Sequence, residues 1–169
     1  MIDLLDNMGY AGAIIKKIRN QSPMKMSTRG RYGLRVMLEL ALRIGRGPVP
    51  VEEIAEAQGI SGHYIHLLVP VLRRAGLVRT VRGPKGGCVL SRPPAAITLL
   101  EVVEAVEGKP APVECVTDPA SCGKSGGCAA REVWAEVAGA VESVLGRTTL
   151  EELAVRQKGQ CAPEADWQI

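Results

Sequence analysis

The 169-residue sequence contains no phenylalanine, and tryptophan and tyrosine raise its aromatic content to only 3%. Because 46% of the residues are nonetheless apolar, we expect a core built from Leu, Val, Ile and Ala. The sequence also lacks an apolar run that could span a bilayer. Its N-terminus, with Asp3 and Asp6, lacks a secretory pattern. We therefore expect a cytoplasmic protein with no membrane partner, in which cysteines stay reduced.

Histidine is scarce as well, with only His63 and His66, and both fall on one predicted helix. No nucleophile stands beside a base, and no pair of carboxylates occupies a recognisable catalytic motif. The sequence therefore does not predict an enzyme. The chemistry that remains is that of its charges and its cysteines.

Positive charge is concentrated in the first half of the chain. Residues 24–92 contain twelve Lys or Arg against four Asp or Glu, whereas residues 93–169 contain six against twelve. This asymmetry, +8 against −6, is hidden in the net charge of +3. It indicates that the first half meets a polyanion and the second does not. Solvated surface charge is the simpler alternative, but the basic half also has the pattern of a DNA-binding fold.

A helix is predicted from Ser27 or Thr28, either of which can cap it, to about Ile44. Apolar residues recur along it at helical spacing and predict a buried side: Leu34, Met37, Leu38, Ala41 and Ile44. Arg29 and Arg31 lie on its early turns, where their side chains can reach the phosphates of DNA.

Residues 51–57 and 61–75 predict two further helices, joined by the tight turn Gln58-Gly59-Ile60. This is the helix-turn-helix arrangement, in which the later helix reads the major groove. Pro70 removes one backbone hydrogen bond and is expected to bend that helix after its first turns. We expect the DNA-contacting front to comprise Ser61, His63, Tyr64 and His66. The alternative for the two histidines is a surface position with no special role.

Residues 77–81 and 88–90 are predicted to form two strands, separated by the basic, Gly-rich tip Arg82-Gly-Pro-Lys-Gly-Gly87. Together they predict a wing in which Arg82 and Lys85 lie along phosphates or enter the minor groove. The tip does not match the pattern of a nucleotide-binding P-loop. Cys88 sits on the second strand and is predicted to be a buried structural thiol.

Three of the five cysteines, Cys115, Cys122 and Cys128, lie in one short segment with the spacing C-x6-C-x5-C. Pro119 and nearby glycines break regular structure there, so we expect a loop that can bring three sulfurs to one point. Three cysteines cannot all pair as disulfides. Thiolates are soft ligands for iron–sulfur clusters, zinc or cuprous copper, and structural zinc usually takes four ligands in closer pairs. The loop therefore favours a cluster over zinc, with reactive or incidental thiols as the alternative.

After this loop, residues 129–145 predict a long helix with an apolar face too broad for solvent: Val133, Trp134, Val137, Val141, Val144 and Leu145. That face either covers its own domain or pairs with a second copy, and we favour pairing into a homodimer. Before the loop, Thr98 and Glu101 predict a capping box at the start of a helix. Thr148 and Thr149 are expected to cap a last short helix.

These elements predict a mainly α fold with a small β-wing, that is, a winged helix-turn-helix domain plus a long dimerisation helix. We divide the chain into a leader (residues 1–23), a DNA-binding domain (24–92), a cysteine loop with the dimerisation helix (93–156) and a polar tail (157–169). The leader is expected to be either loosely ordered or an additional helix. Cys161, in the tail, is expected to bind no metal.

With these elements in place, the chain resembles the IscR-like winged helix-turn-helix transcription regulators, many of which sense iron–sulfur clusters. The resemblance covers Met24 to about Arg156. It rests on several stretches taken together: Ser27-Thr-Arg-Gly-Arg-Tyr-Gly-Leu34, Ile60-Ser-Gly-His-Tyr64, Leu72-Arg-Arg-Ala-Gly-Leu-Val78, Val81-Arg-Gly-Pro-Lys-Gly-Gly87, Ile97-Thr98 and Thr148-Thr-Leu-Glu-Glu-Leu153.

The resemblance implies a homodimer crossed by its long helices and bound to a two-half-site operator in double-stranded DNA. It implies that Cys115, Cys122 and Cys128 ligate an iron–sulfur cluster, often [2Fe–2S], near the dimer interface. The DNA contacts that it implies are at Ser61, His63, Tyr64, His66 and Arg82.

Two positions depart from the family pattern. Arg131 stands where several cluster-binding relatives have a histidine as fourth ligand, and a guanidinium cannot serve. Glu114, Asp118, Glu132, a partner-chain residue or a small thiol are the alternatives, and the incomplete set also suits a [4Fe–4S] cluster. His66 replaces an acidic or amide residue, so the operator sequence does not transfer.

The sequence therefore predicts a cluster-sensing transcription regulator that controls cluster biogenesis or iron and redox stress genes. Two alternatives stay open. One is a cluster-independent regulator of cysteine or sulfur metabolism with the same fold; that branch lacks the cysteine loop, and the intact loop here argues against it. The other is a zinc or thiol redox adaptor that acts through protein partners.

Overall fold

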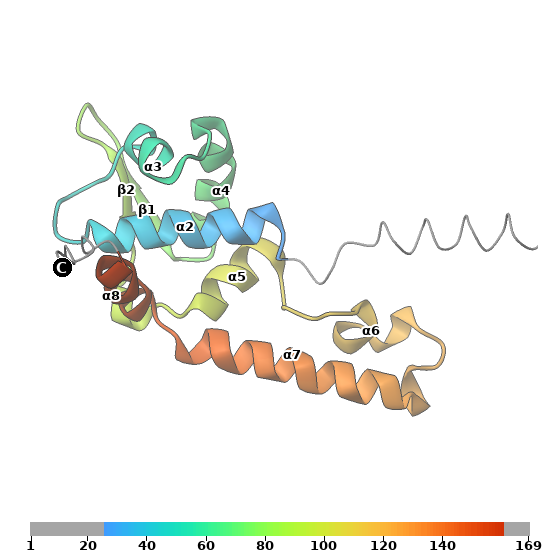
Figure 1. Cartoon of the computed structure of the whole chain (residues 1–169). Helices are drawn as coiled ribbons and strands as arrows, with labels where there is room; N and C mark the ends of the chain where they lie inside the picture. Colours follow the sequence, from blue (N-terminus) through green and yellow to red (C-terminus); the bar gives the residue numbers. More distant parts are fainter. Residues whose placement is uncertain (1–25, 161–169) are drawn as a thin grey trace, which may run out of the picture.

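The computed structural model describes residues 26–160, so the predictions for the leader and for Cys161 lie outside the described residues. It is mainly helical with one two-stranded antiparallel sheet, which confirms the predicted fold class. No helix within residues 26–160 combines the length and the apolar character needed to cross a membrane. The main elements of Figure 1 are α2 (Thr28–Leu42), α3 (Val51–Gln58), α4 (Gly62–Arg74), β1 (Val78–Val81), β2 (Gly87–Leu90), α5 (Leu99–Glu107), α6 (Glu114–Thr117), α7 (Ala129–Arg147) and α8 (Leu150–Gln160).

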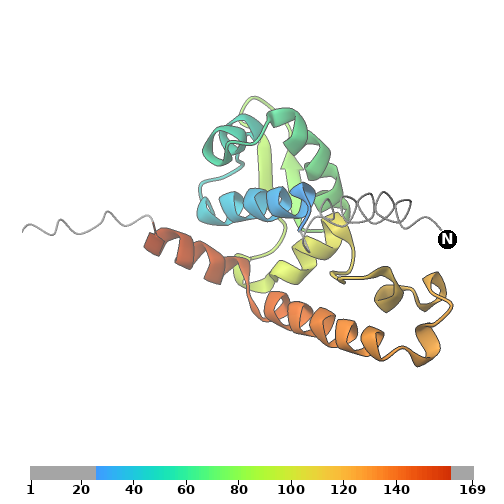
Figure 2. The ribbon, with the colours of Figure 1, turned by 45° about the vertical axis from the view of Figure 1, so that its right-hand side comes forward.

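Helix α2 lies at the centre of the fold. Helices α3 and α4 and the β1–β2 hairpin lie on one side of it, and α5, α7 and α8 lie on the other, as both Figure 1 and the turned view in Figure 2 show. Residues on several sides of α2 are buried, including Gly30, Gly33 and Met37. The central helix therefore joins the predicted DNA-binding elements to the half that carries the cysteine loop.

The core is aliphatic, as the absence of phenylalanine predicts. Its fully buried side chains come from the DNA-binding half and from the segment that follows it, and they include Met37, Ile54, Ile65, Leu68, Leu72, Leu77, Ile97 and Val102. Each such side chain contributes roughly 1.5–3 kcal/mol when it is removed from water. The exposed front of α4 therefore belongs to a helix whose opposite side is packed into this core.

The turn between α3 and α4 is built around Gly59, which adopts the left-handed conformation (φ 59°, ψ 38°). This conformation ends α3 and lets the Ile60 N–H donate to the Ala55 carbonyl (3.1 Å). Helix α4 begins at Gly62 and continues through Pro70 to Arg74. The proline therefore lies inside a helix that runs on to its predicted end.

A buried carboxylate, Glu39 of α2, connects α2 to the start and the end of α3. Glu39 is only 6% exposed, and it accepts from Arg43 Nε (2.6 Å) and Gln58 Nε2 (2.7 Å). Arg43 also pairs with Glu53, and Arg35 Nε donates to Gln58 Oε1 (3.1 Å). The hydrogen bond to Glu39 is the main reason that the pKa of Arg43 is raised. Because both carboxylate oxygens of Glu39 accept a hydrogen bond, this buried network holds the helix-turn-helix turn against α2.

The starts of α5 and α8 are tied by an isolated antiparallel bridge between Thr98 and Thr149, flanked by two backbone hydrogen bonds of 2.9 Å. The predicted capping role is confirmed for Thr149, whose hydroxyl accepts from the Glu152 N–H (3.2 Å). It is wrong for Thr148, whose hydroxyl donates back to the Val144 carbonyl of α7 (2.8 Å). Helix α8 continues to Gln160, beyond the expected boundary at residue 156. The polar composition after that boundary therefore does not end the helix.

The predicted capping box of α5 is also present. The Thr98 hydroxyl accepts from the Glu101 N–H (3.3 Å), and the Glu101 carboxylate accepts from the Thr98 N–H (2.9 Å). Partial burial favours the neutral carboxyl, but the hydrogen bonds from Thr98 and Arg92 outweigh it and lower the pKa of Glu101. These contacts define where α5 starts, and its far end leads into the cysteine loop.

Candidate nucleic-acid interface and cysteine loop

The front of α4 is organised by its cap. The Ser61 hydroxyl accepts from the Tyr64 N–H (3.2 Å), which satisfies one of the free donors of the first turn. His63 and His66 are exposed, as is Ser61. These three predicted contacts therefore face solvent from the first two turns of the reading helix.

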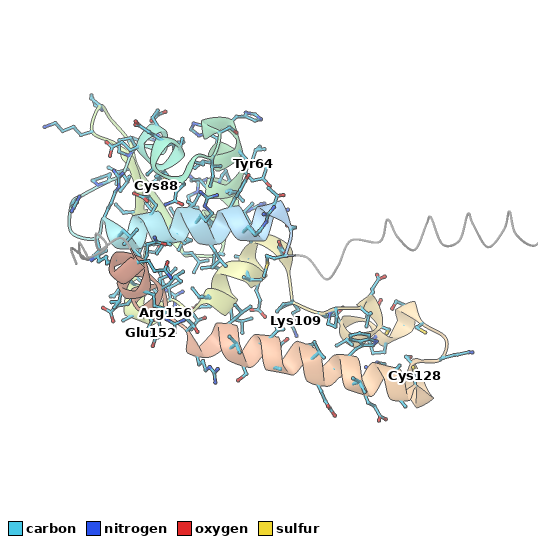
Figure 3. The ribbon with its side chains drawn as sticks, in the orientation of Figure 1. Tyr64, Cys88, Lys109, Cys128, Glu152 and Arg156 are labelled. Carbon is cyan, nitrogen blue, oxygen red and sulfur yellow. The ribbon has the colours of Figure 1, made fainter. Side chains whose placement is uncertain are left out.

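Tyr64 differs from the other predicted contacts because it is half-buried. Its ring packs edge-on against Tyr32 of α2, with centroids 5.4 Å apart and planes at 89°, and Figure 3 shows it between α4 and α2. The Arg35 guanidinium lies 5.7 Å from the Tyr32 ring centroid. Tyr64 therefore also anchors the reading helix, a role that needs a residue far away in the sequence.

Leu67 is a surface feature of α4 that the sequence analysis missed. Its side chain is 58% exposed, and it follows His63 by four residues on the same helix, which places both on one face. An exposed apolar side chain on a reading helix can contact the methyl group of thymine. The signal available in the sequence was a leucine outside the buried spacing of Ile65, Leu68 and Leu72.

The first turn of α2 offers a second cationic surface. Ser27 caps the helix by accepting from the Arg29 N–H (3.0 Å) and the Gly30 N–H (3.3 Å). The side chains of Arg29 and Arg31 are exposed, and Arg31 donates only to its neighbour Thr28 (3.2 Å) among the described residues. Both guanidinium groups can therefore reach phosphates.

The wing is the hairpin of β1 and β2, which pair from Val78↔Leu90 to Val81↔Gly87. Arg82 and Lys85 at its tip are exposed. Neither has a recorded hydrogen bond or ion pair within residues 26–160. The hairpin and α4 lie on the same side of α2, away from α7 (Figure 1), so both can meet one nucleic acid.

Cys88 on β2 confirms the prediction of a buried structural thiol. It is 2% exposed and lies in the upper half of the fold, remote from Cys128 (Figure 3). Burial raises the pKa of the Cys88 thiol, so the thiol stays protonated and poorly nucleophilic. Its backbone exchanges hydrogen bonds of 2.8 and 2.9 Å with Val49, which joins the wing to the segment before α3.

Gly87 is the residue that permits this close approach. A Cβ at this position would overlap the Val49 carbonyl and lie 2.8 Å from the backbone nitrogen of Pro50, and φ is +155°. We expect Gly87→Ala to destabilise the fold by roughly 2–4 kcal/mol, because backbone atoms must move. Urea unfolding measures this, with Gly123→Ala as control, since a Cβ at Gly123 meets open space. Equal midpoints for the two variants would show that the wing adjusts freely.

The cysteine loop connects α5 to α7 and is more structured than predicted. Cys115 lies in the single-turn helix α6, Cys122 follows a short 3-10 turn, and Cys128 caps the N-terminus of α7. The prediction of a wholly irregular segment is therefore wrong at Cys115. One turn of helix forms between the prolines and glycines, because its backbone bonds are local: the Asp118 N–H donates to the Glu114 carbonyl (2.8 Å).

Arg131, which cannot be a metal ligand, has a structural contact instead. Its Nε donates to the backbone carbonyl of Cys115 (2.8 Å), so the first turn of α7 holds the first cysteine segment. Asp118, a candidate fourth ligand, accepts from the Ala120 N–H (3.0 Å) and so closes a turn. Glu114 and Glu132 are exposed. The side chains of the two glutamates are therefore more available as a fourth ligand than that of Asp118.

The three loop cysteines have the right donor chemistry, but their sulfurs are not gathered. All three are half-buried and none forms a disulfide. Within residues 26–160, no three His, Cys, Asp or Glu side chains come together in a group that could hold a metal ion. No residue from Gly108 to Cys128 is buried, so drawing the sulfurs together would not disturb the core. Soft thiolate donors therefore fit a cluster, provided that the loop rearranges.

Helix α7 carries an apolar stripe, defined here as Val137, Ala140, Val141, Val144 and Leu145, which lines an open groove of about 370 Å³. Val133 and Trp134 extend it and are 56% and 41% exposed. Only Ala138 of this helix is buried, so α7 covers its own domain over a narrow contact. Of the broad apolar face that the sequence predicts, Val133, Trp134 and Val144 are exposed, whereas Val137, Val141 and Leu145 are half-buried.

Comparison with known proteins shows which family shares this architecture. The pattern of a family described as "Rrf2: Iron-dependent Transcriptional regulator" matches residues 26–156. The HTH-type transcriptional regulator CymR of Bacillus subtilis is 44% identical over 81% of this chain and 94% of its own length. The regulator IscR of Xenorhabdus nematophila is 37% identical over 80% of this chain and 82% of its own length.

Solved structures agree with the sequence matches. The structure of CymR, described as the global cysteine regulator of B. subtilis, superposes with a TM-score of 0.66 over 78% of this chain and 97% of CymR. The T. potens IscR structure, 35% identical, superposes with a TM-score of 0.70 over 83% of this chain and 93% of IscR. Regulators of both names resemble the chain over 78–83% of its length. The chain therefore belongs to the Rrf2 family of DNA-binding transcription regulators and is not an enzyme.

Proposed function

We propose that this regulator senses an iron–sulfur cluster on Cys115, Cys122 and Cys128, and that the cluster changes its affinity for an operator in double-stranded DNA. The observation that carries the proposal is the cysteine loop: three free, half-buried thiols on a segment without buried residues. Thiolates are the usual ligands of such clusters. We propose a [2Fe–2S] cluster, with [4Fe–4S] as the alternative. When bound, it would supply an iron centre that responds to oxidants and to iron supply.

The DNA half of the proposal divides the contacts by role. Ser61, His63, His66 and the exposed Leu67 on α4 face base edges in the major groove, where sequence is read. Arg29, Arg31, Arg82 and Lys85 contact phosphates, which supply affinity but no sequence information. The excess of positive charge over residues 24–92 supports this division, since it coincides with α2, α4 and the wing.

We further propose that the apolar stripe of α7 pairs with the same stripe of a second copy. Only apolar side chains line the groove along the stripe, and the side chain of Val144 is 50% exposed. A helix of 19 residues offers about 28 Å of length for such pairing. A homodimer presents two α4 helices, as a two-half-site operator requires.

The test of sensing is anaerobic reconstitution with iron and sulfide, followed by operator binding with and without the cluster. We expect visible absorbance from cluster–thiolate bonds, near-stoichiometric iron, and a difference in operator Kd between the two forms. Protein that stays colourless and iron-free refutes the cluster. Identical Kd values for both forms on operators selected from random DNA refute its regulatory role.

The wing has a test of its own. We expect Arg82→Ala to weaken operator binding by roughly three- to tenfold and to lower the slope of log affinity against log salt by about 1, because one phosphate contact is lost. Fluorescence anisotropy over a salt series measures both. Lys109→Ala is the matched control, since this exposed lysine lies on the other side of α2 (Figure 3). A salt slope unchanged by Arg82→Ala would mean that the wing does not touch DNA.

A second candidate function is cluster-independent control of cysteine or sulfur metabolism. It is favoured by the higher identity to CymR, 44% against 37% for the X. nematophila IscR. The ungathered sulfurs of the described chain also agree with it. Under this function the metal-free protein binds its operator fully, and adding iron and sulfide changes neither the absorbance nor the Kd. The reconstitution experiment therefore separates the two candidates.

A further inference from the structure

Glu107 joins the cysteine half of the molecule to the first turn of α2. It is the last residue of α5, and its Oε1 accepts from the Gly30 N–H of α2 (2.8 Å) and from the Ser27 hydroxyl. The first N–H groups of a helix have no partner inside it. A carboxylate at that position also interacts favourably with the helix dipole. A residue of α5 thus completes the cap of α2.

The two helices touch without clearance at this point. A Cβ on Gly30 would overlap the Glu107 carboxylate and lie 2.6 Å from Met26 Sδ, and a Cβ on Gly33 would lie 3.2 Å from the Val106 methyl groups. Glycine at both positions lets α5 approach α2 this closely. A displacement of the end of α5 must therefore move the first turn of α2 or break the Glu107 contacts.

The two ends of this contact carry different functions. On one side, the first turn of α2 bears the exposed Arg29 and Arg31. On the other side, Gly108 ends α5 with φ +88°, and a short linker leads to Cys115. In Figure 1 this linker leaves α5 beneath the N-terminal end of α2 and descends to α6. A change in the loop therefore reaches Glu107 before it reaches any other contact with α2.

We propose that Glu107 is a positioning residue that couples the state of the cysteine loop to the phosphate-contacting turn of α2. The proposal rests on the proposed cluster sensing. In one loop state the carboxylate stays on Ser27 and Gly30 and holds the turn. In the other state the end of α5 shifts, the contact is released, and Arg29 and Arg31 lose their fixed positions. Ser27 still caps α2 by itself, so the helix stays folded in both states.

The experiment compares operator Kd for cluster-loaded and cluster-free protein in the wild type, Glu107→Ala and Glu107→Gln. In Glu107→Ala we expect the ratio of the two Kd values to lie closer to one than in the wild type, by a factor of roughly three to ten. Glu107→Gln should keep most of it, because its Oε1 still accepts from Ser27 and Gly30. Removing a negative charge near DNA raises affinity in both forms and cancels in the ratio.

Glu104→Ala is the matched control. Glu104 is exposed, lies one turn earlier on α5, and its side chain has no recorded hydrogen bond or ion pair within residues 26–160. This variant should keep the ratio of the wild type. Amide hydrogen exchange at residues 29–31 gives a second readout: protection should differ between cluster-loaded and cluster-free wild type, and be equally low in both forms of Glu107→Ala.

The outcomes separate the two proposals. A wild type whose Kd does not depend on the cluster refutes cluster sensing, and the coupling falls with it. A wild type that senses the cluster while Glu107→Ala keeps the full ratio overturns the coupling alone. A ratio lost equally in Glu107→Ala and Glu104→Ala also overturns it, because the effect would then not depend on the contact of Glu107 with α2.

Discussion

Val141→Glu should convert the protein to a monomer and reduce its operator affinity by about 10²–10⁴-fold, which is the avidity that two linked half-site contacts provide. Val141 lies in the middle of the apolar stripe of α7. In a symmetric dimer the glutamate of each copy would be buried against the substituted stripe of the other copy. An unpaired buried charge is strongly unfavourable. Analytical ultracentrifugation measures the mass, and fluorescence anisotropy measures operator binding.

The same helix offers a matched control. Ala135 is exposed and does not line the stripe, so Ala135→Glu adds the same charge to another face and should leave the dimer intact. Circular dichroism of both variants verifies that α7 stays helical. If Val141→Glu sediments as a dimer, α7 does not form the interface, and its exposed valines need another explanation.

Cys122→Ala should remove the visible absorbance of the reconstituted protein and its bound iron while leaving the fold unchanged. Cys122 is the central ligand of the proposed set, and two thiolates separated by the whole loop are too few to hold a cluster. The residue is half-buried in a segment without core side chains, so its loss should cost little stability. Iron and sulfide analysis, with the ultraviolet–visible spectrum, measures the cluster, and urea unfolding measures stability.

Cys161→Ala is the control for this substitution, since Cys161 is expected to bind no metal. It should retain the complete spectrum. A Cys122→Ala protein with full iron content would overturn the ligand assignment, and loss of iron in Cys161→Ala would add a ligand from the tail. Loss in both would point to a ligand set that the spacing of the loop cysteines does not predict.

Local patterns explain how much of the fold could be predicted. The buried stripe of α2 formed at Met37, Leu38 and Ala41, but Ile44 lies beyond the end of the helix at Leu42 and is 58% exposed. The turn at Gly59, the wing glycines and the capping box of Thr98 and Glu101 depend on neighbours a few residues apart, and each formed where the sequence predicted it. The helical turn at Cys115 was missed, and α8 runs to Gln160, into the segment that the sequence analysis assigns to the polar tail. Helix ends depend on small energy differences between local hydrogen bonds, which composition describes poorly.

The candidate site divides in the same way. The exposed arginines, the histidines of α4 and the three loop cysteines could be selected from residue type and spacing alone. The packing of Tyr64 on Tyr32 and the contact of Arg131 with the Cys115 carbonyl could not, because each depends on the position of a different element. The spacing of the cysteines permits the sulfurs to meet, but it does not require them to meet.

By itself the sequence determined an aliphatic core, a basic reading half, a thiol-rich loop and an apolar helix face, since composition and periodicity act over a few residues. Only the tertiary structure decided which of these communicate. Glu107 and Gly30 are 77 residues apart, and they meet because two glycines let α5 approach α2 closely. Such a contact has no local signature, because it exists only once both helices have packed against the same core.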